Sequence, residues 1–167
     1  MFYEDKQMLE HIINEISNKT YDDLDKCIDE MMKIHHRYIS KFIIAKEREG
    51  LSTKTIEKYE KYLDFFAIGY LTYYCTNHIF NGYQQFDDFF GYYCIYKMGI
   101  SKTFIIECVP VLKKFYNFLY QQGYINKEAN DFAELYLKDG KEHWLEELSD
   151  FDNGIYNDFG LNEMDED

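Results

Sequence analysis

Apolar residues recur at steps of three and four along nearly the whole chain, which is the pattern of amphipathic helices. The clearest stripe predicts a helix over residues 52–76, and weaker stripes predict helices over 9–18, 20–50, 86–99 and 101–123. No segment shows the alternation of a strand. The sequence therefore predicts an all-α fold, a compact bundle of five to seven helices.

Residues that cap and end helices stand at the boundaries of these stripes. Side chains suited to N-caps occur at Thr20, Ser52, Ser101 and Asn126. Glycines suited to helix ends occur at Gly50, Gly99 and Gly123. Gly140 is expected to break the sixth helix, leaving a last short helix over 143–148. The prediction is one helical domain over residues 1–148, followed by an acidic tail over 149–167.

Charge is distributed unevenly along the 167 residues, whose formal net charge is −13. Residues 1–30 carry a net −6, residues 31–130 a net +4, and residues 131–167 a net −11. Because phosphate contacts need Lys and Arg, only the mildly basic middle is suited to nucleic acid. The acidic ends favour a basic partner instead.

Two predicted helix starts resemble each other. Each follows a glycine and an apolar residue with hydroxyl side chains and a lysine: Ser52, Lys54 and Thr55, then Ser101, Lys102 and Thr103. Free N–H groups at a helix start, together with hydroxyls and a lysine, form the elements of an anion site. These residues are therefore predicted to contact a nucleic-acid backbone, with plain helix capping as the alternative.

A second basic feature lies on the predicted helix over residues 20–50. Lys33, Arg37 and Lys41 follow one another at steps of four and so share a helix face. Such a face either contacts phosphates or is simply solvated. The three side chains join the predicted nucleic-acid-binding set.

The same segments carry a family resemblance. The first half of the pattern is Leu51-Ser52, Thr55-Ile56, Tyr59, Leu63 and Phe66, and the second half extends from Gly99 to Ile125. Over about residues 30–130 this resembles the core-binding, SAM-like N-terminal domain of tyrosine recombinases, the phage integrase family. The resemblance implies a helical bundle that clamps DNA and implies DNA-facing roles for the starts at Ser52–Thr55 and Ser101–Thr103.

The catalytic half of that family has no counterpart here. Recombinases need Arg, Lys, His and a tyrosine nucleophile in a separate domain, whereas the 44 residues after Gly123 contain no Arg. No phosphate-binding glycine loop or nucleophile elbow occurs, and the adjacent His35 and His36 point about 100° apart on a helix. We therefore expect no enzyme, no cofactor and no metal site.

Location and cysteine usage point to the cytoplasm. Four cysteines without a CxxC motif are expected to be buried, reduced thiols. Charged residues at positions 4–6 interrupt any signal peptide. The longest uncharged run, residues 65–86, holds too many polar side chains to cross a membrane.

Three functional hypotheses follow. The first is a non-catalytic module in DNA transactions: a regulator, an accessory factor or a relic of a mobile element. The second is an acidic inhibitor or adaptor that engages a basic partner, for example by mimicking nucleic-acid charge, through Asp150, Asp152, Asp158, Glu163, Asp165, Glu166 and Asp167. The third is a homo-oligomer that buries aromatic helix faces against a second copy.

Overall fold

A computed structural model describes residues 1–154 of the chain, and residues 155–167 lie outside the described part. Within residues 1–154 all regular structure is helical and no strand occurs, which confirms the predicted all-α class. The elements in chain order are α1 (Phe2–Asn18), α2 (Leu24–Arg48), α3 (Thr53–Leu63), η1 (Asp64–Tyr74), η2 (Gly82–Gln85), α4 (Phe86–Asp88), η3 (Phe89–Lys97), α5 (Lys102–Gln121) and α6 (Lys127–Asp152).

The elements η1 and η3 are π-helices, which the sequence did not predict. Each continues a preceding α-helix, so residues 53–74 and 86–97 form two continuous helices. Each of these helices ends with a π-type hydrogen bond, in which a backbone N–H donates to the carbonyl five residues earlier. Cys75 N donates to Tyr70 O at 2.9 Å, and Met98 N donates to Tyr93 O at 3.0 Å. Tyr74, the last residue of η1, contacts η3 where its ring lies 4.6 Å from that of Tyr93. Because π-helices mostly span a single turn, two of this length are unusual.

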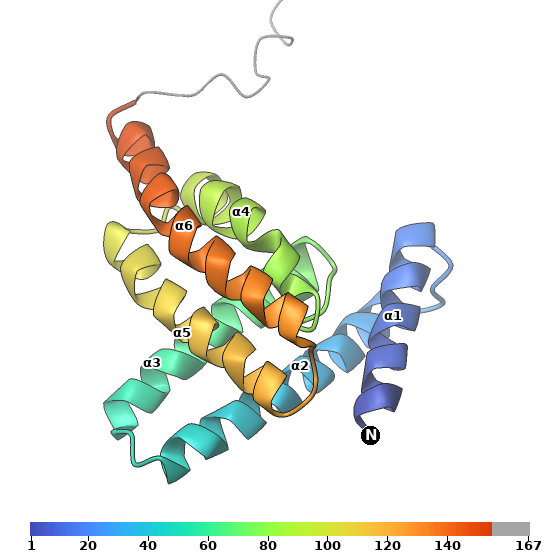
Figure 1. The fold of residues 1–167 in the computed structure, drawn as a ribbon. Helices are drawn as coiled ribbons and strands as arrows, with labels where there is room; N and C mark the ends of the chain where they lie inside the picture. Colours follow the sequence, from blue (N-terminus) through green and yellow to red (C-terminus); the bar gives the residue numbers. More distant parts are fainter. Residues whose placement is uncertain (155–167) are drawn as a thin grey trace, which may run out of the picture.

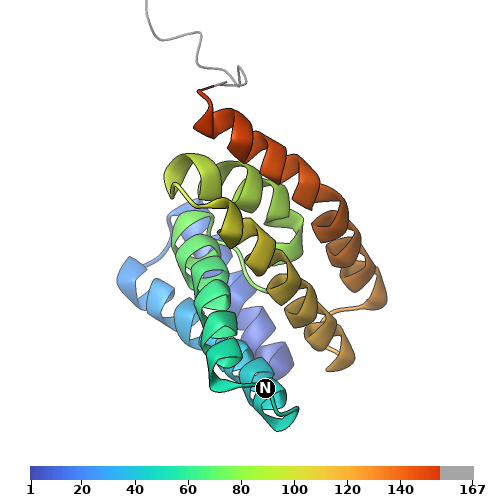
Figure 2. The same cartoon turned by 90° about the vertical axis from the view of Figure 1, so that its left-hand side faces the viewer.

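The helices pack around an aromatic core. In both views α5 and α6 run antiparallel and side by side, while α1 packs along α2 at the edge of the molecule (Figures 1 and 2). The largest fully buried side chains include Tyr38, Phe42, Phe66, Tyr70, Phe86, Phe89, Phe90, Phe115, Tyr116 and Trp144. Burial of this much aromatic surface is the main stabilising contribution to the bundle.

Most predicted helix boundaries are confirmed, but the first helix begins at Phe2 rather than near residue 9, and one cap is wrong. Ser52 and Asn126 each accept a hydrogen bond from the backbone N–H three residues ahead. Asp23, not Thr20, caps α2, since Asp23 Oδ1 accepts from Lys26 N at 3.1 Å. Asp23 immediately precedes the first helical residue, whereas the Thr20 hydroxyl faces Glu15 O at the end of α1.

The prediction that Gly140 breaks the last helix is also wrong. Helix α6 continues through Gly140 and past residue 148 to Asp152. A Cβ atom at position 140 would lie 2.4 Å from Cζ2 of Trp144, so the glycine makes room for the indole. That ring stacks on Phe90 at 4.5 Å, and its Nε1 donates to Asp87 at 3.1 Å. Packing against η3 therefore offsets the low helix propensity of glycine.

Candidate functional site

The basic stripe on α2 is engaged by side chains of the same protein. Lys33 Nζ lies 3.1 Å from Glu30, and the Arg37 guanidinium donates to the carboxylate of Asp5. Lys41 Nζ donates to the Tyr124 hydroxyl at 3.3 Å and lies 5.2 Å above the Tyr38 ring. The stripe therefore fastens α1 and the α5–α6 connection to α2.

Asp5 is the residue of this cluster that sequence analysis missed. Its side chain is buried and accepts hydrogen bonds from Arg37 and from the Tyr38 hydroxyl, the latter at 2.8 Å. Burial by itself would raise the pKa of Asp5, but the two hydrogen bonds and the Arg37 charge outweigh it and hold the pKa below its ordinary value. Its position four residues before Leu9 and seven before Ile12 placed it on the buried face of α1.

The first helix start uses its hydroxyls locally. Ser52 Oγ accepts from Thr55 N at 3.3 Å and lies 2.9 Å from Thr55 Oγ1, while Lys54 is exposed. The second start differs, because Ser101 occupies the N-cap position of α5 without a capping hydrogen bond from its side chain. Lys102 and Thr103 are exposed there.

The structure does not bring the two helix starts together. Helices α3 and α5 are antiparallel, since Tyr62 donates to Glu107 at 2.6 Å and Lys114 donates to Tyr59 at 2.8 Å. Phe104, near the start of α5, packs on Phe65 of η1. Phe65 lies ten residues beyond Thr55, so the starts are separated by about 15 Å along the helix axis.

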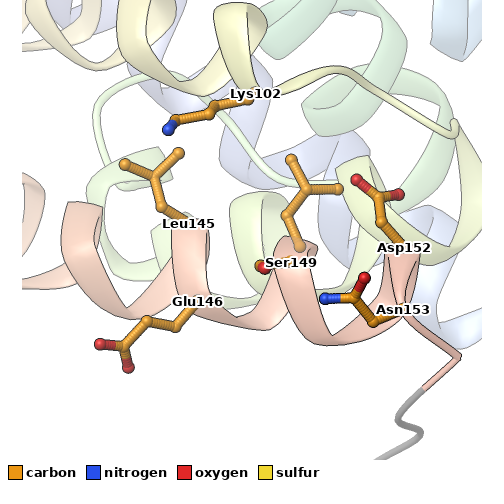
Figure 3. Close-up of a pocket in the computed structure, with 7 residues that line it drawn as sticks. Lys102, Leu145, Glu146, Ser149, Asp152 and Asn153 are labelled. Atoms are coloured by element: carbon orange, nitrogen blue, oxygen red, sulfur yellow. The ribbon is translucent and has the colours of Figure 1, made fainter.

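Lys102 instead lies beside the C-terminal part of α6, with its ammonium group turned toward Leu145 and away from Asp152 (Figure 3). It lines a pocket of about 450 Å³ between α5 and α6, together with Leu145, Glu146, Leu148, Ser149, Asp152 and Asn153. A residue predicted to contact phosphate and one predicted to contact a basic partner therefore line the same pocket. The negative charge of Asp152 and Glu146 there disfavours a phosphate.

The predicted partner-binding acids divide into two groups. Asp150 and Asp152 lie in the last turns of α6, with Asp152 exposed and Asp150 partly buried. From residue 142 to the end of the chain there are ten carboxylates and no Lys or Arg. The remaining five predicted acids lie outside the described residues: Asp158, Glu163, Asp165, Glu166 and Asp167.

A second hollow, unpredicted from the sequence, lies between α1 and the start of α2. It has a volume of about 550 Å³ and combines apolar, carboxylate and thiol side chains. We name it the α1–α2 groove, defined by Met8, His11, Ile12, Glu15, Asp22, Asp23, Lys26, Cys27 and Glu30. The helical spacing of Met8, Ile12 and Glu15 on one helix and of Asp23, Cys27 and Glu30 on the next was the available signal.

The burial of the four cysteines differs from the prediction at two of them. All four cysteines are free, but only Cys94 and Cys108 are buried; Cys27 in the α1–α2 groove and Cys75 at the end of η1 are half-buried, which corrects the expectation for those two. Over residues 1–154, no three His, Cys, Asp or Glu side chains gather as a metal ion requires. None of the helices there combines the length and apolarity that crossing a bilayer demands.

Comparison with other proteins adds no further constraint. No protein-family model, curated protein or solved structure matches the chain. The resemblance to the recombinase core-binding domain, the cytoplasmic location and the homo-oligomer stay predictions.

Proposed function

We propose that this chain is a protein-binding adaptor or inhibitor that engages a basic partner through its acidic surface. The observation that carries the proposal is the C-terminal half of α6, where Glu142, Glu146 and Asp152 are exposed and no Lys or Arg occurs from residue 142 onward. Such a surface attracts a cationic partner at long range and gives fast, salt-sensitive association.

The contacts of the basic side chains on α2 also favour a protein partner over nucleic acid. Arg37 is committed to a buried carboxylate, and Lys41 to two tyrosines, so neither is free for phosphate without breaking a contact that holds α1 or the α5–α6 connection. Lys33 is already paired with Glu30. The DNA-binding hypothesis stays a prediction that rests on Lys54 and Lys102, at opposite ends of the α3–α5 pair.

The proposal is tested with the full chain and two labelled probes, a lysine- and arginine-rich peptide and a short duplex DNA. Fluorescence anisotropy at low salt measures binding to each. We expect the peptide to bind, with an affinity that falls steeply as salt rises. Retention of duplex DNA together with indifference to the peptide would overturn the proposal in favour of the DNA-binding hypothesis.

Charge-matched variants locate the effect. The variant E142Q/E146Q/D150N/D152N removes four carboxylates from the C-terminal half of α6, and E47Q/E49Q/E57Q/E60Q removes four from α3 and from the last residues and C-cap of α2. Both change the net charge equally. Weaker peptide binding in the first variant but not the second supports the proposal, and an equal loss in both shows that only overall charge matters.

A further inference from the structure

The α1–α2 groove has an apolar floor that reaches the surface. Ile12 is buried, Cys27 is half-buried, and Met8 is 47% exposed above them. A methionine side chain is flexible and polarizable, and adapts to the shape of an apolar group placed against it. The floor can therefore receive an apolar side chain without rearrangement of the helices.

The rim of the α1–α2 groove is acidic. Its carboxylates are Glu15, Asp22, Asp23 and Glu30, facing a single lysine, Lys26. The pairings nearest to the groove are weak or exposed: His11 lies 3.3 Å from Glu15, and Glu30 is shared with Lys33. The rim thus keeps a net negative charge.

The negative charge of the rim affects the Cys27 thiol on the floor of the groove. Burial raises the pKa of the Cys27 thiol, and the carboxylates of Glu15 and Asp23 raise it further. A negative potential therefore reaches the apolar floor and is not confined to the tips of the rim side chains. A cation bound over Cys27 would relieve it.

We infer that the α1–α2 groove binds a lysine- or arginine-rich segment of a partner protein, with one apolar side chain of that segment inserted over Met8 and Cys27. The inference rests on the proposed function and adds a second contact for the basic partner, on α1 and α2 rather than on the end of α6. The chain's own residues 155–167 do not fit, since they carry five carboxylates and no Lys or Arg. Charge complementarity selects a foreign, basic occupant.

The test uses the full chain and two lysine-rich peptides that differ at one central position, leucine in one and serine in the other. We expect the leucine peptide to bind about fivefold to tenfold more tightly, because its side chain leaves water for the floor of the groove. It should also slow alkylation of Cys27 by a maleimide. Cys75, the other half-buried thiol, lies outside the groove and serves as the internal reference.

Groove variants separate the two components of binding. M8S should weaken the leucine peptide and leave the serine peptide unchanged. E15Q/D22N should weaken both peptides, while E10Q/D29N, with the same charge change on exposed positions outside the groove, should weaken them far less.

The outcomes distinguish the inference from the proposed function. Equal affinity of the two peptides, with Cys27 unprotected, overturns the groove. If binding is lost only in E142Q/E146Q/D150N/D152N and Cys27 stays reactive, the groove is wrong and the acidic adaptor stands. If neither peptide binds at low salt, both are overturned.

Discussion

His35 and His78 are buried in the core, and each has one ring nitrogen without a hydrogen-bond partner among the described residues. His35 Nδ1 lies 3.1 Å from Ala67 O and 2.9 Å from Thr72 Oγ1. Since Thr72 already donates to Ala67 O, both groups accept from His35, which assigns its proton to Nδ1. Both rings are held neutral, because an uncompensated buried charge is costly.

Acid should therefore destabilise the protein well above the range in which carboxylates titrate. Burial lowers the pKa of His35 to about 3 and that of His78 to about 4, from an ordinary 6.5. The folded state binds fewer protons than the unfolded state, so the stability is complete above the ordinary pKa and is lost as pH falls toward the folded values. Between about pH 7.5 and pH 5, each histidine should remove about 2 kcal/mol from the free energy of unfolding.

Urea unfolding at the two pH values measures this loss. H35Q replaces the titrating ring with an amide that can still donate to Ala67 O, so its pH dependence should fall by about half. Asp5 does not interfere, since its lowered pKa lies below this window. An H35Q protein with the full wild-type slope would show that His35 is not the titrating group.

Gly140 offers a second prediction on a single residue. G140A places a methyl group 2.4 Å from the Trp144 ring, which stacks on Phe90 and cannot move without disturbing the core. We expect a loss of about 1–3 kcal/mol in the free energy of unfolding. G69A is the matched control, because its Cβ would meet nothing closer than Tyr93 Oη at 3.8 Å. Equal stability of G140A and wild type would mean that the ring is not fixed there.

At the scale of elements, local rules predicted most helix boundaries but not what happens inside the helices. Ser52, Asn126 and the positive-φ glycines Gly50 and Gly123 act through their own backbone neighbourhood, and all four were predicted. The π-helices escaped prediction, since a shift from four- to five-residue hydrogen bonds leaves little trace in apolar spacing. Whether Gly140 breaks α6 depends on Trp144 and Phe90, which no local rule includes.

Docking of α1 on α2 should depend on Asp5. D5A removes the acceptor of both Arg37 and Tyr38 and leaves the guanidinium without its partner. Because Arg37 is partly exposed, the expected loss is about 1–3 kcal/mol rather than that of a fully buried pair. Hydrogen–deuterium exchange should show faster exchange throughout α1 with α5 and α6 unchanged. E10A, an exposed acid on the same helix, is the control, and uniform protection in D5A would contradict the role assigned to Asp5.

At the scale of the whole molecule, charge counts along the chain predicted the acidic ends but not the fate of the basic middle. The spacing of Lys33, Arg37 and Lys41 correctly placed them on one face of α2. Their partners could not be predicted, because Asp5 and Tyr124 lie 32 and 83 residues away from the cations they contact. The α1–α2 groove could not be predicted either, because it forms only when the two helices pack against each other.

Salt should act on the fold and on the proposed complex in opposite directions. With a net charge of −13, the folded protein repels itself, and raising ionic strength from about 10 mM to 150 mM shortens the screening length from about 30 Å to 8 Å. We expect a gain of about 1 kcal/mol, seen as a rise of about 2–4 °C in Tm. The same change should weaken binding of a basic peptide, because there the screened interaction is attractive. E142Q/E146Q/D150N/D152N should shrink both effects together. A Tm that falls with salt would mean that ion pairs such as Arg37–Asp5 outweigh the repulsion between the acidic ends.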